Sequence, residues 1–375
     1  MNPRQRLTRT APVFVLLALL AGCAPAVPTP THTAARATPS PSPSTASAPG
    51  SRVPLGCSGL LDASSWQALA GTGAKVDLDE NTAPANLAST AQAQYGALTC
   101  DWDGTTTASA SNPGSELTVV VAPDAKTGFD SRFAAIMADQ TQTTHPAAIQ
   151  NIAGTQSGYW CGTDLDALGA DADLPICDAE MLVSNYWVSV QVGTVTGFTR
   201  PQLTAGLTAA LIELAAKLKA AGPPPAQWTA PATPPGFCTS GASTATVRAI
   251  IGDPTLASDP PLAPTLYAQT IGLVGRDVSC AWTSAQSGAV SIELLAGGSW
   301  VFPGFTPKAP SDSVIQGPYA ATAIPGASSA LLACTDDSCE AYLAIGTTAA
   351  DIYTPGGPAA SKTWLAALVK AIAAS

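Results

Sequence analysis

A cysteine pattern that occurs twice in the chain is the strongest constraint on the fold. Cys57 is followed 43 positions later by Cys100, and Cys238 is followed 42 positions later by Cys280. Each second cysteine begins a Cys-x-Trp sequence. A repeated spacing with a shared motif favours two copies of one small scaffold over a single irregular domain.

The elements around these cysteines also occur in the same order. A helix is predicted to end at the glycine of `CSGLLDASSWQALAG` (57–71) and of `CTSGASTATVRAIIG` (238–252). Alternating segments at 116–122 and 290–296 predict strands. Each block then closes with an amphipathic helix. In the first block its apolar stripe is Leu203, Leu207, Leu211, Leu214 and Leu218.

This order predicts an α+β fold with two similar domains, each an antiparallel sheet with N- and C-terminal helices packed on it. An extra helix at 127–140 is expected in the first block alone. The predicted organisation is a signal peptide (1–22), a lipidated cysteine with a disordered tether (23–54), domain 1 (55–221), a proline-rich linker (222–236) and domain 2 (237–375).

The beginning of the chain has the features of an export signal. Arg4, Arg6 and Arg9 precede an apolar run at residues 11–20. A permanent membrane-spanning helix needs about 20 residues, so this run is too short for one. The following Leu20-Ala-Gly-Cys23 resembles a bacterial lipobox, which implies that Cys23 receives the lipid and becomes the first residue. The alternative is an ordinary secretory signal.

Residues 24–54 are mostly Pro, Ala, Ser and Thr. Such a segment buries too little apolar surface to offset chain entropy, so we expect a disordered tether. At roughly 3.1 Å per residue, it reaches about 90 Å from the membrane. We therefore expect the protein to lie on the extracytoplasmic face of the cell membrane, attached to the bilayer through its acyl anchor.

Eight cysteines remain once Cys23 is assigned to lipid. They are Cys57, Cys100, Cys161, Cys177, Cys238, Cys280, Cys334 and Cys339. An even number on an exported chain predicts disulfides. Four cysteines per block allow three pairings each, and we favour first with second and third with fourth.

Structural disulfides have two alternatives. Zinc is disfavoured because the chain has no C-x-x-C pair, and its only histidines are His32 and His145. A redox role for Cys334 and Cys339 is the second alternative, although catalytic thiols usually lie closer together.

The lipobox, the tether, the opening cysteine and the Cys-x-Trp strand together resemble actinobacterial lipoproteins of unknown function. The folded part of those proteins is a small α+β domain, PsbP-like or related, here in tandem. The resemblance implies a curved antiparallel sheet with helices against it, no established activity, and an actinobacterial source.

Charge and motifs exclude several function classes. The formal net charge is −10, which makes nucleic acid a poor partner. The sequence has no pattern for a serine nucleophile, a zinc protease, a phosphate-binding loop or a dinucleotide site. We therefore predict no catalytic residue, no metal and no cofactor. His145 directly precedes Pro146 and is expected in a loop.

Acids gather between the late cysteines of the first block, at Asp164, Asp166, Asp171 and Asp173. Asp336 and Asp337 lie between those of the second block. A solvated loop is the simplest interpretation of both groups. A weak calcium site and an acidic patch for a basic partner are the alternatives.

Aromatic pairs flank the same cysteines of the first block, as Tyr159-Trp160 and Tyr186-Trp187. Neighbouring strand residues point to opposite faces, so one member of each pair is expected in the core and the other on the surface. The candidate ligand surface, for a glycan, lipid or peptide, is Tyr159, Trp160, Asp164, Asp166 and Trp187.

These observations predict a membrane-anchored, non-catalytic ligand-binding, protein-binding or accessory module of the cell envelope. The alternatives are an envelope hydrolase that uses carboxylates and a structural partner of an envelope complex.

Overall fold

A computed structural model provides the fold. It describes residues 50–71, 75–79, 84, 86–103, 116–130, 148–163, 175–193, 198–225, 236–238, 242–259, 277–307, 315 and 318–375. These residues all belong to one compact unit, Thr45–Ser375.

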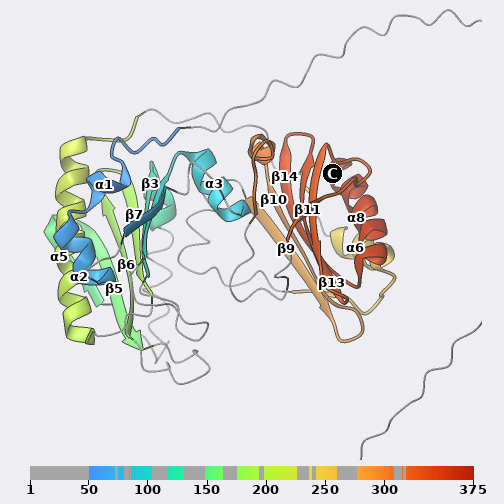
Figure 1. Cartoon of the computed structure of the whole chain (residues 1–375), viewed down its shortest axis with the longest axis horizontal. Coiled ribbons are helices and arrows are strands. Elements are labelled where there is room, and N and C mark those ends of the chain that lie inside the picture. The colour runs from blue at the N-terminus through green and yellow to red at the C-terminus, as the bar shows by residue number, and fades with distance from the viewer. Residues whose placement is uncertain are drawn as a thin grey trace, which may run out of the picture. The chain divides into compact units, whose positions relative to one another are not determined.

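Two seven-stranded antiparallel sheets form the framework (Figure 1). The strands of the first sheet are β1 (Lys75–Asp79), β2 (Leu98–Asp103), β3 (Glu116–Pro123), β4 (Ala148–Gln150), β5 (Gln156–Thr163), β6 (Pro175–Val183) and β7 (Tyr186–Val192). Those of the second are β8 (Ala257–Ser258), β9 (Asp277–Ser284), β10 (Gly288–Leu295), β11 (Ala320–Ala321), β12 (Ser329–Cys334), β13 (Ser338–Ile345) and β14 (Thr348–Pro355).

The two sheets have the same strand order. The first runs β1-β2-β3-β7-β6-β5-β4, and the second, from its other edge, runs β8-β9-β10-β14-β13-β12-β11. Each strand of one sheet therefore has a counterpart in the other, from β1 with β8 to β7 with β14. The predicted α+β class with antiparallel sheets is confirmed.

The helices are α1 (Cys57–Leu60), α2 (Ala63–Ala70), α3 (Leu87–Tyr95), α5 (Arg200–Ala221), α6 (Ser243–Ile251) and α8 (Pro358–Ala373). Two 3₁₀ turns, η2 (Ile152–Gly154) and η3 (Gly298–Val301), complete the described elements. Residues 126–130 begin the predicted extra helix, and the rest of that prediction lies outside the described residues.

The opening helices differ from the prediction in length. The first is broken into α1 and α2, because Leu61 is extended (φ −130°, ψ 138°) and Asp62 is extended as well. The backbone N–H of Asp62 donates to Glu213 Oε1 at 2.6 Å, so α5 satisfies a donor at this break. The second opening helix starts at Ser243, five residues later than Cys238.

Helix α5 follows from its sequence. Thr199 and Gln202 form the predicted capping box at its start, and Gly222 ends it with φ 82°. The five leucines of the predicted stripe are completely buried and share one apolar cluster with β3, β6 and β7. Burial of a leucine side chain stabilises by roughly 1.5–3 kcal/mol, so this stripe fixes which side of α5 meets the sheet.

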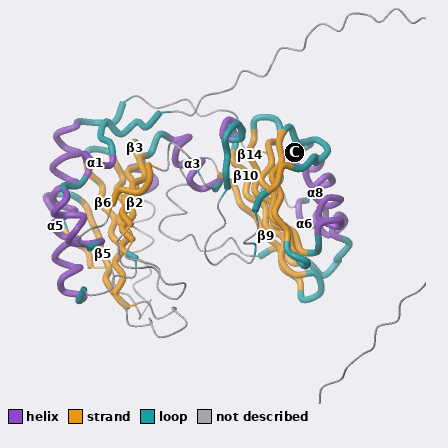
Figure 2. The backbone as a smooth tube through the Cα atoms, in the orientation of Figure 1, coloured by secondary structure: helices purple, strands orange, loops and turns teal. Residues whose placement is uncertain are grey.

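A second apolar cluster joins α6 and α8 to β10, β13 and β14. Figure 2 shows these two helices on one side of the second sheet. Val247 of α6 and Leu365, Leu368 and Ile372 of α8 are buried in it. Its strand members, such as Ile292 and Ile352, occupy alternate positions, so they line one face of the second sheet.

Four disulfides link the eight described cysteines: Cys57–Cys100, Cys161–Cys177, Cys238–Cys280 and Cys334–Cys339. This is the pairing that we favoured. The first and third bonds join the opening segment of each half to its Cys-x-Trp strand, β2 or β9. Trp102 and Trp282 are buried there, as expected of core residues.

The second and fourth disulfides each connect neighbouring strands. Cys161 lies directly opposite Cys177 in the register of β5 and β6, and Cys334 lies directly opposite Cys339 in that of β12 and β13. Both bonds therefore pin a hairpin, as predicted.

Candidate functional site

Trp187 does not lie on the predicted ligand surface. Its side chain is fully buried, and its ring makes an edge contact with Phe129 at 5.7 Å. Tyr186 is also buried, on the opposite face of β7, in the cluster with α5. The expectation of an exposed aromatic in this pair is wrong, because both faces of β7 are covered at this point.

The other members of that surface are only partly described. Tyr159 is half-buried against the cluster that contains α5. The side chain of Trp160 and the acids Asp164, Asp166, Asp171 and Asp173 lie outside the described residues, as do Cys23 and His145. A ligand surface around Tyr159 and Asp164 therefore stays a prediction.

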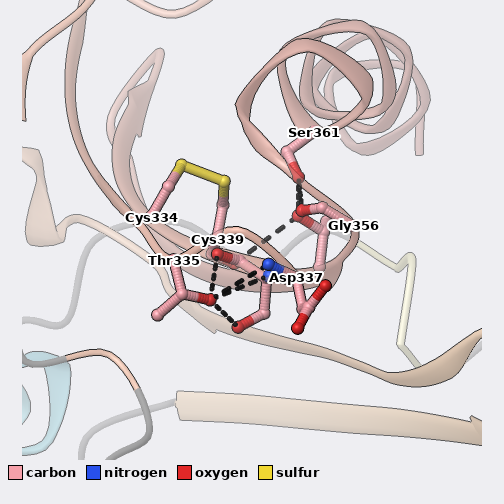
Figure 3. The surroundings of a disulfide bond; sticks show 8 residues. Cys334, Thr335, Asp337, Cys339, Gly356 and Ser361 are labelled. Atoms are coloured by element: carbon pink, nitrogen blue, oxygen red, sulfur yellow. Dashed lines mark hydrogen bonds between the residues drawn. A yellow bond between two sulfur atoms is a disulfide. The ribbon is translucent and has the colours of Figure 1, made fainter. Parts of the chain in front are cut away.

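The two acids of the second block lie in the short loop that the Cys334–Cys339 bond closes (Figure 3). Asp336 and Asp337 are exposed. The loop is held against the start of α8, since Gly356 N–H donates to the Asp337 carbonyl at 2.5 Å. Ser361 Oγ then donates to the Gly356 carbonyl at 2.9 Å. This arrangement supports a structural role for the bond, and a redox role stays untested.

The second sheet carries a different group of acids that the sequence did not indicate. We call Asp277, Glu293, Glu340 and Asp351 the acid row. Glu293 on β10 lies directly opposite Asp351 on β14, and Asp351 lies directly opposite Tyr342 on β13. Since side chains alternate along strands, the acid row lies on the face turned away from α6 and α8.

Three members of the acid row, Asp277, Glu293 and Asp351, have raised pKa values. Burial raises the pKa of Glu293 well above its ordinary value, and the neighbouring charge of Asp277 raises that pKa further. Burial and the charge of Glu340 raise the pKa of Asp351, and a hydrogen bond with Tyr342 partly opposes this. Burial also raises the pKa of Asp277, which shares a hydrogen bond with Glu293. Like charges that face each other across strands destabilise a sheet, so the facing pair Glu293 and Asp351 favours bound protons.

Two tyrosines extend the acid row toward a group of aromatic rings. Tyr319 Oη donates to Glu340, and burial raises the pKa of both Tyr319 and Tyr342. The two tyrosine rings are 5.3 Å apart, and Phe305 lies 5.1 Å from Tyr342. The site is thus a set of carboxyl and phenol groups at the edge of an apolar cluster.

The first sheet has a partial counterpart. By register, Val120, Ser189 and Glu180 take the positions of Glu293, Asp351 and Tyr342, and Asp178 takes that of Glu340. Burial raises the pKa of Asp178 to about 6, and a hydrogen bond from Gln191 opposes the shift. The polar face is therefore common to both sheets, and the concentration of acids belongs to the second.

Within the described parts of the chain, no group of three or more His, Cys, Asp or Glu residues is arranged to hold a metal ion. A shallow hollow of about 600 Å³ lies elsewhere, along the outer face of α5 from Arg200 to Ile212. One helix supplies all of its lining residues, so it is open surface.

The chain has no match among protein families, curated proteins or solved structures. Of the helices that the structure describes, none combines the length and apolar character needed to cross a bilayer.

Proposed function

We propose that the protein is a lipid-anchored, extracytoplasmic binding or accessory module of the cell envelope. The observation that carries this proposal is the distribution of cysteines. All eight that lie in the described residues are paired as disulfides, which favours an oxidising compartment. The ninth, Cys23, is the residue that a lipobox would modify.

The anchor is tested with the full chain expressed in its own envelope or in that of a related bacterium. Mass spectrometry should find an amino-terminal Cys23 carrying acyl chains, and fractionation should place the protein with membranes. Cys23→Ala should move it to the soluble extracytoplasmic fraction. Ser40→Ala, in the tether, is the matched control and should stay with membranes. An unmodified amino terminus in the wild type would refute the anchor.

We further infer that the folded part consists of two similar domains, 55–221 and 237–375, that follow a disordered tether. The equal strand order of the sheets supports this. The equivalent placement of the disulfides, from Cys57–Cys100 with Cys238–Cys280 to Cys161–Cys177 with Cys334–Cys339, supports it as well. A duplicated scaffold on a tether suits recognition of a glycan, a lipid or another envelope protein.

A binding role is tested by crosslinking in intact cells. Wild type and Cys23→Ala should recover different sets of envelope components, because only the wild type would be held at the membrane. A component that depends on Tyr159 as well as on the anchor would support the predicted ligand surface. If wild type and Cys23→Ala recover the same envelope components, the proposed function at the membrane is contradicted.

An envelope hydrolase that uses carboxylates is the second candidate. It rests on Glu293 and Asp351, because burial raises the pKa of both carboxyls and a raised pKa is what a general acid requires. It ranks second because the hollow along α5 contains none of these acids. Hydrolysis of envelope glycans that disappears in Glu293→Gln and persists in Asp336→Asn would reverse this order.

A further inference from the structure

Helix α3 lies between β1 and β2 of the first sheet in the sequence, yet it contacts the second sheet. Leu87 and Ala91 of α3 are buried in one cluster with residues of η3, β10, β13 and β14. We call these residues the α3 seat; they are Leu295, Val301, Phe305, Tyr342 and Ala349. The seat lies on the face of the second sheet that also carries the acid row.

Gln94 fixes α3 in this position. Its side chain is 1% exposed, and its amide N–H donates to the Ala296 carbonyl at 2.6 Å. Its amide oxygen accepts from the Trp300 indole N–H at 3.3 Å. A buried amide satisfied on both sides is specific, because displacement would leave several polar groups unpaired.

The C-terminal end of α3 is held by the first half of the chain. Gln92 accepts a hydrogen bond from Thr99 on β2. The Arg52 guanidinium lies over the Tyr95 ring at 5.5 Å, and the backbone N–H of Arg52 donates to the Gly96 carbonyl at 2.8 Å. Helix α3 therefore contacts both halves of the chain. In the second half, its contacts include Tyr342, which lies opposite Asp351 of the acid row.

Tyr342 links the α3 seat to the acid row. It is a buried member of the α3 seat, and it forms the hydrogen bond that reaches Asp351. The titratable groups facing this region are Asp277 on β9, Glu293 on β10, Glu340 and Tyr342 on β13, Asp351 on β14, and Tyr319 before β11. Neither α3 (`LASTAQAQY`) nor η3 (`GSWV`) contributes a charged side chain.

Tyr342 connects the α3 seat to the facing carboxyls, because it packs in the seat and lies directly opposite Asp351, which in turn lies opposite Glu293. When these carboxyls ionise, the charges repel one another across β10, β14 and β13, and α3 offers no cation to offset them. Hydration of the ionised groups then competes with the apolar contacts of the α3 seat.

We propose that α3 is an acid-responsive latch, which occupies its seat on the second sheet while the facing carboxyls Glu293 and Asp351 hold protons and leaves the seat when they ionise. The latch joins the two halves under acidic conditions and releases them as the pH rises. This inference does not depend on the lipid anchor or on any ligand.

The direction follows from linkage. Burial raises the pKa of Glu293, Asp351 and Asp277. A carboxyl whose pKa is raised in the docked state stabilises docking. This stabilisation is fully present below the ordinary pKa of about 4 and is lost as the pH rises through the raised pKa. Each proton released on undocking changes the docking equilibrium by about tenfold per pH unit.

Hydrogen exchange with mass spectrometry on the full oxidised chain tests the latch, with intrinsic exchange corrected for pH. The α3 peptide should lose protection by about tenfold or more per pH unit above the raised pKa values. Protection of α8, on the other face of the second sheet, should change less. Protection of α3 that is constant from acidic to alkaline pH would overturn the proposal.

Three variants separate the latch from general unfolding. Glu293→Gln with Asp351→Asn should keep α3 protected over the whole pH range, and single Glu293→Gln serves if the double variant does not fold. Gln94→Ala should expose α3 at every pH while β13 stays protected. Asp336→Asn is the matched control and should behave like the wild type. Unchanged pH dependence in the neutralised variants would also overturn the proposal.

Discussion

Arg52 forms an ion pair with Asp124, which joins the start of the described chain to the turn after β3. The same guanidinium donates to the Pro225 carbonyl at 2.8 Å, just after α5. Asp124 in turn accepts from the Asn185 amide at 2.9 Å. These contacts bury Arg52, and Val53 next to it is buried as well, so both residues pack as part of the fold.

Replacement of Arg52 by Ala should be strongly destabilising. It leaves Asp124 without its cation and removes the packing over Tyr95, so we expect the free energy of unfolding in urea to fall by about 3 kcal/mol. Lys126→Ala is the control, because the Lys126–Asp130 pair is exposed and should change stability by less than about 1 kcal/mol. Equal effects of the two substitutions would contradict this role of Arg52.

The disulfides should differ in their contribution to stability. Cys57–Cys100 closes a loop with a sequence separation of 43, whereas Cys334–Cys339 closes one of 5. In the chain-entropy model these closures stabilise by about 4 and about 2 kcal/mol. Paired Cys→Ser variants, compared by urea unfolding, should show the larger loss for Cys57 and Cys100. A larger loss for the short loop would show that packing, rather than loop closure, dominates.

Asp178 should make the first sheet sensitive to pH. Its pKa is raised to about 6, so its protonated form stabilises the fold. This stabilisation is full below about pH 4 and is lost as the pH rises through 6. In Asp178→Asn the free energy of unfolding should depend less on pH between about pH 4 and values above 6. The difference from the wild type across this range should be at most about 3 kcal/mol. NMR titration of the Asp178 carboxyl checks the pKa directly, and a midpoint near 4 would contradict the prediction.

Trp187 should behave as a core residue rather than as part of a ligand surface. Because it is fully buried against Phe129, Trp187→Ala should reduce the free energy of unfolding by about 3–5 kcal/mol. Ile212→Ala, at a residue that is 49% exposed, is the matched control and should change it by less than about 1 kcal/mol. A stable Trp187→Ala protein would restore Trp187 to the candidate surface.

Several features could be predicted from the sequence because they depend on local or covalent chemistry. The capping box at Thr199 and the stripe from Leu203 to Leu218 depend on helical periodicity, and both are confirmed. The repeated spacing left three disulfide pairings open in each block, and the structure has the pairing that it favours. Trp102 and Trp282 could be assigned to the core because each lies two residues from a bridged cysteine on an alternating strand.

The acid row could not be predicted in the same way. In each strand, Glu293, Glu340 and Asp351 alternate with apolar residues, which by itself is the ordinary pattern of a strand with one solvated face. They become a cluster only because β14 lies between β10 and β13, and that neighbour order is not written in any one segment. Trp187 and the break between α1 and α2 were missed for a related reason, since partners distant in the sequence cover or satisfy them.

The sequence by itself determined the α+β class and the inner face of α5, because periodicity acts within one segment, and the structure settled which cysteines pair. The tertiary structure alone decided that α3 leaves its own sheet for the Gln94 contacts with Ala296 and Trp300, and that four carboxyls share one face. These are contacts between segments far apart in the chain. Their energies depend on burial, which no local pattern specifies.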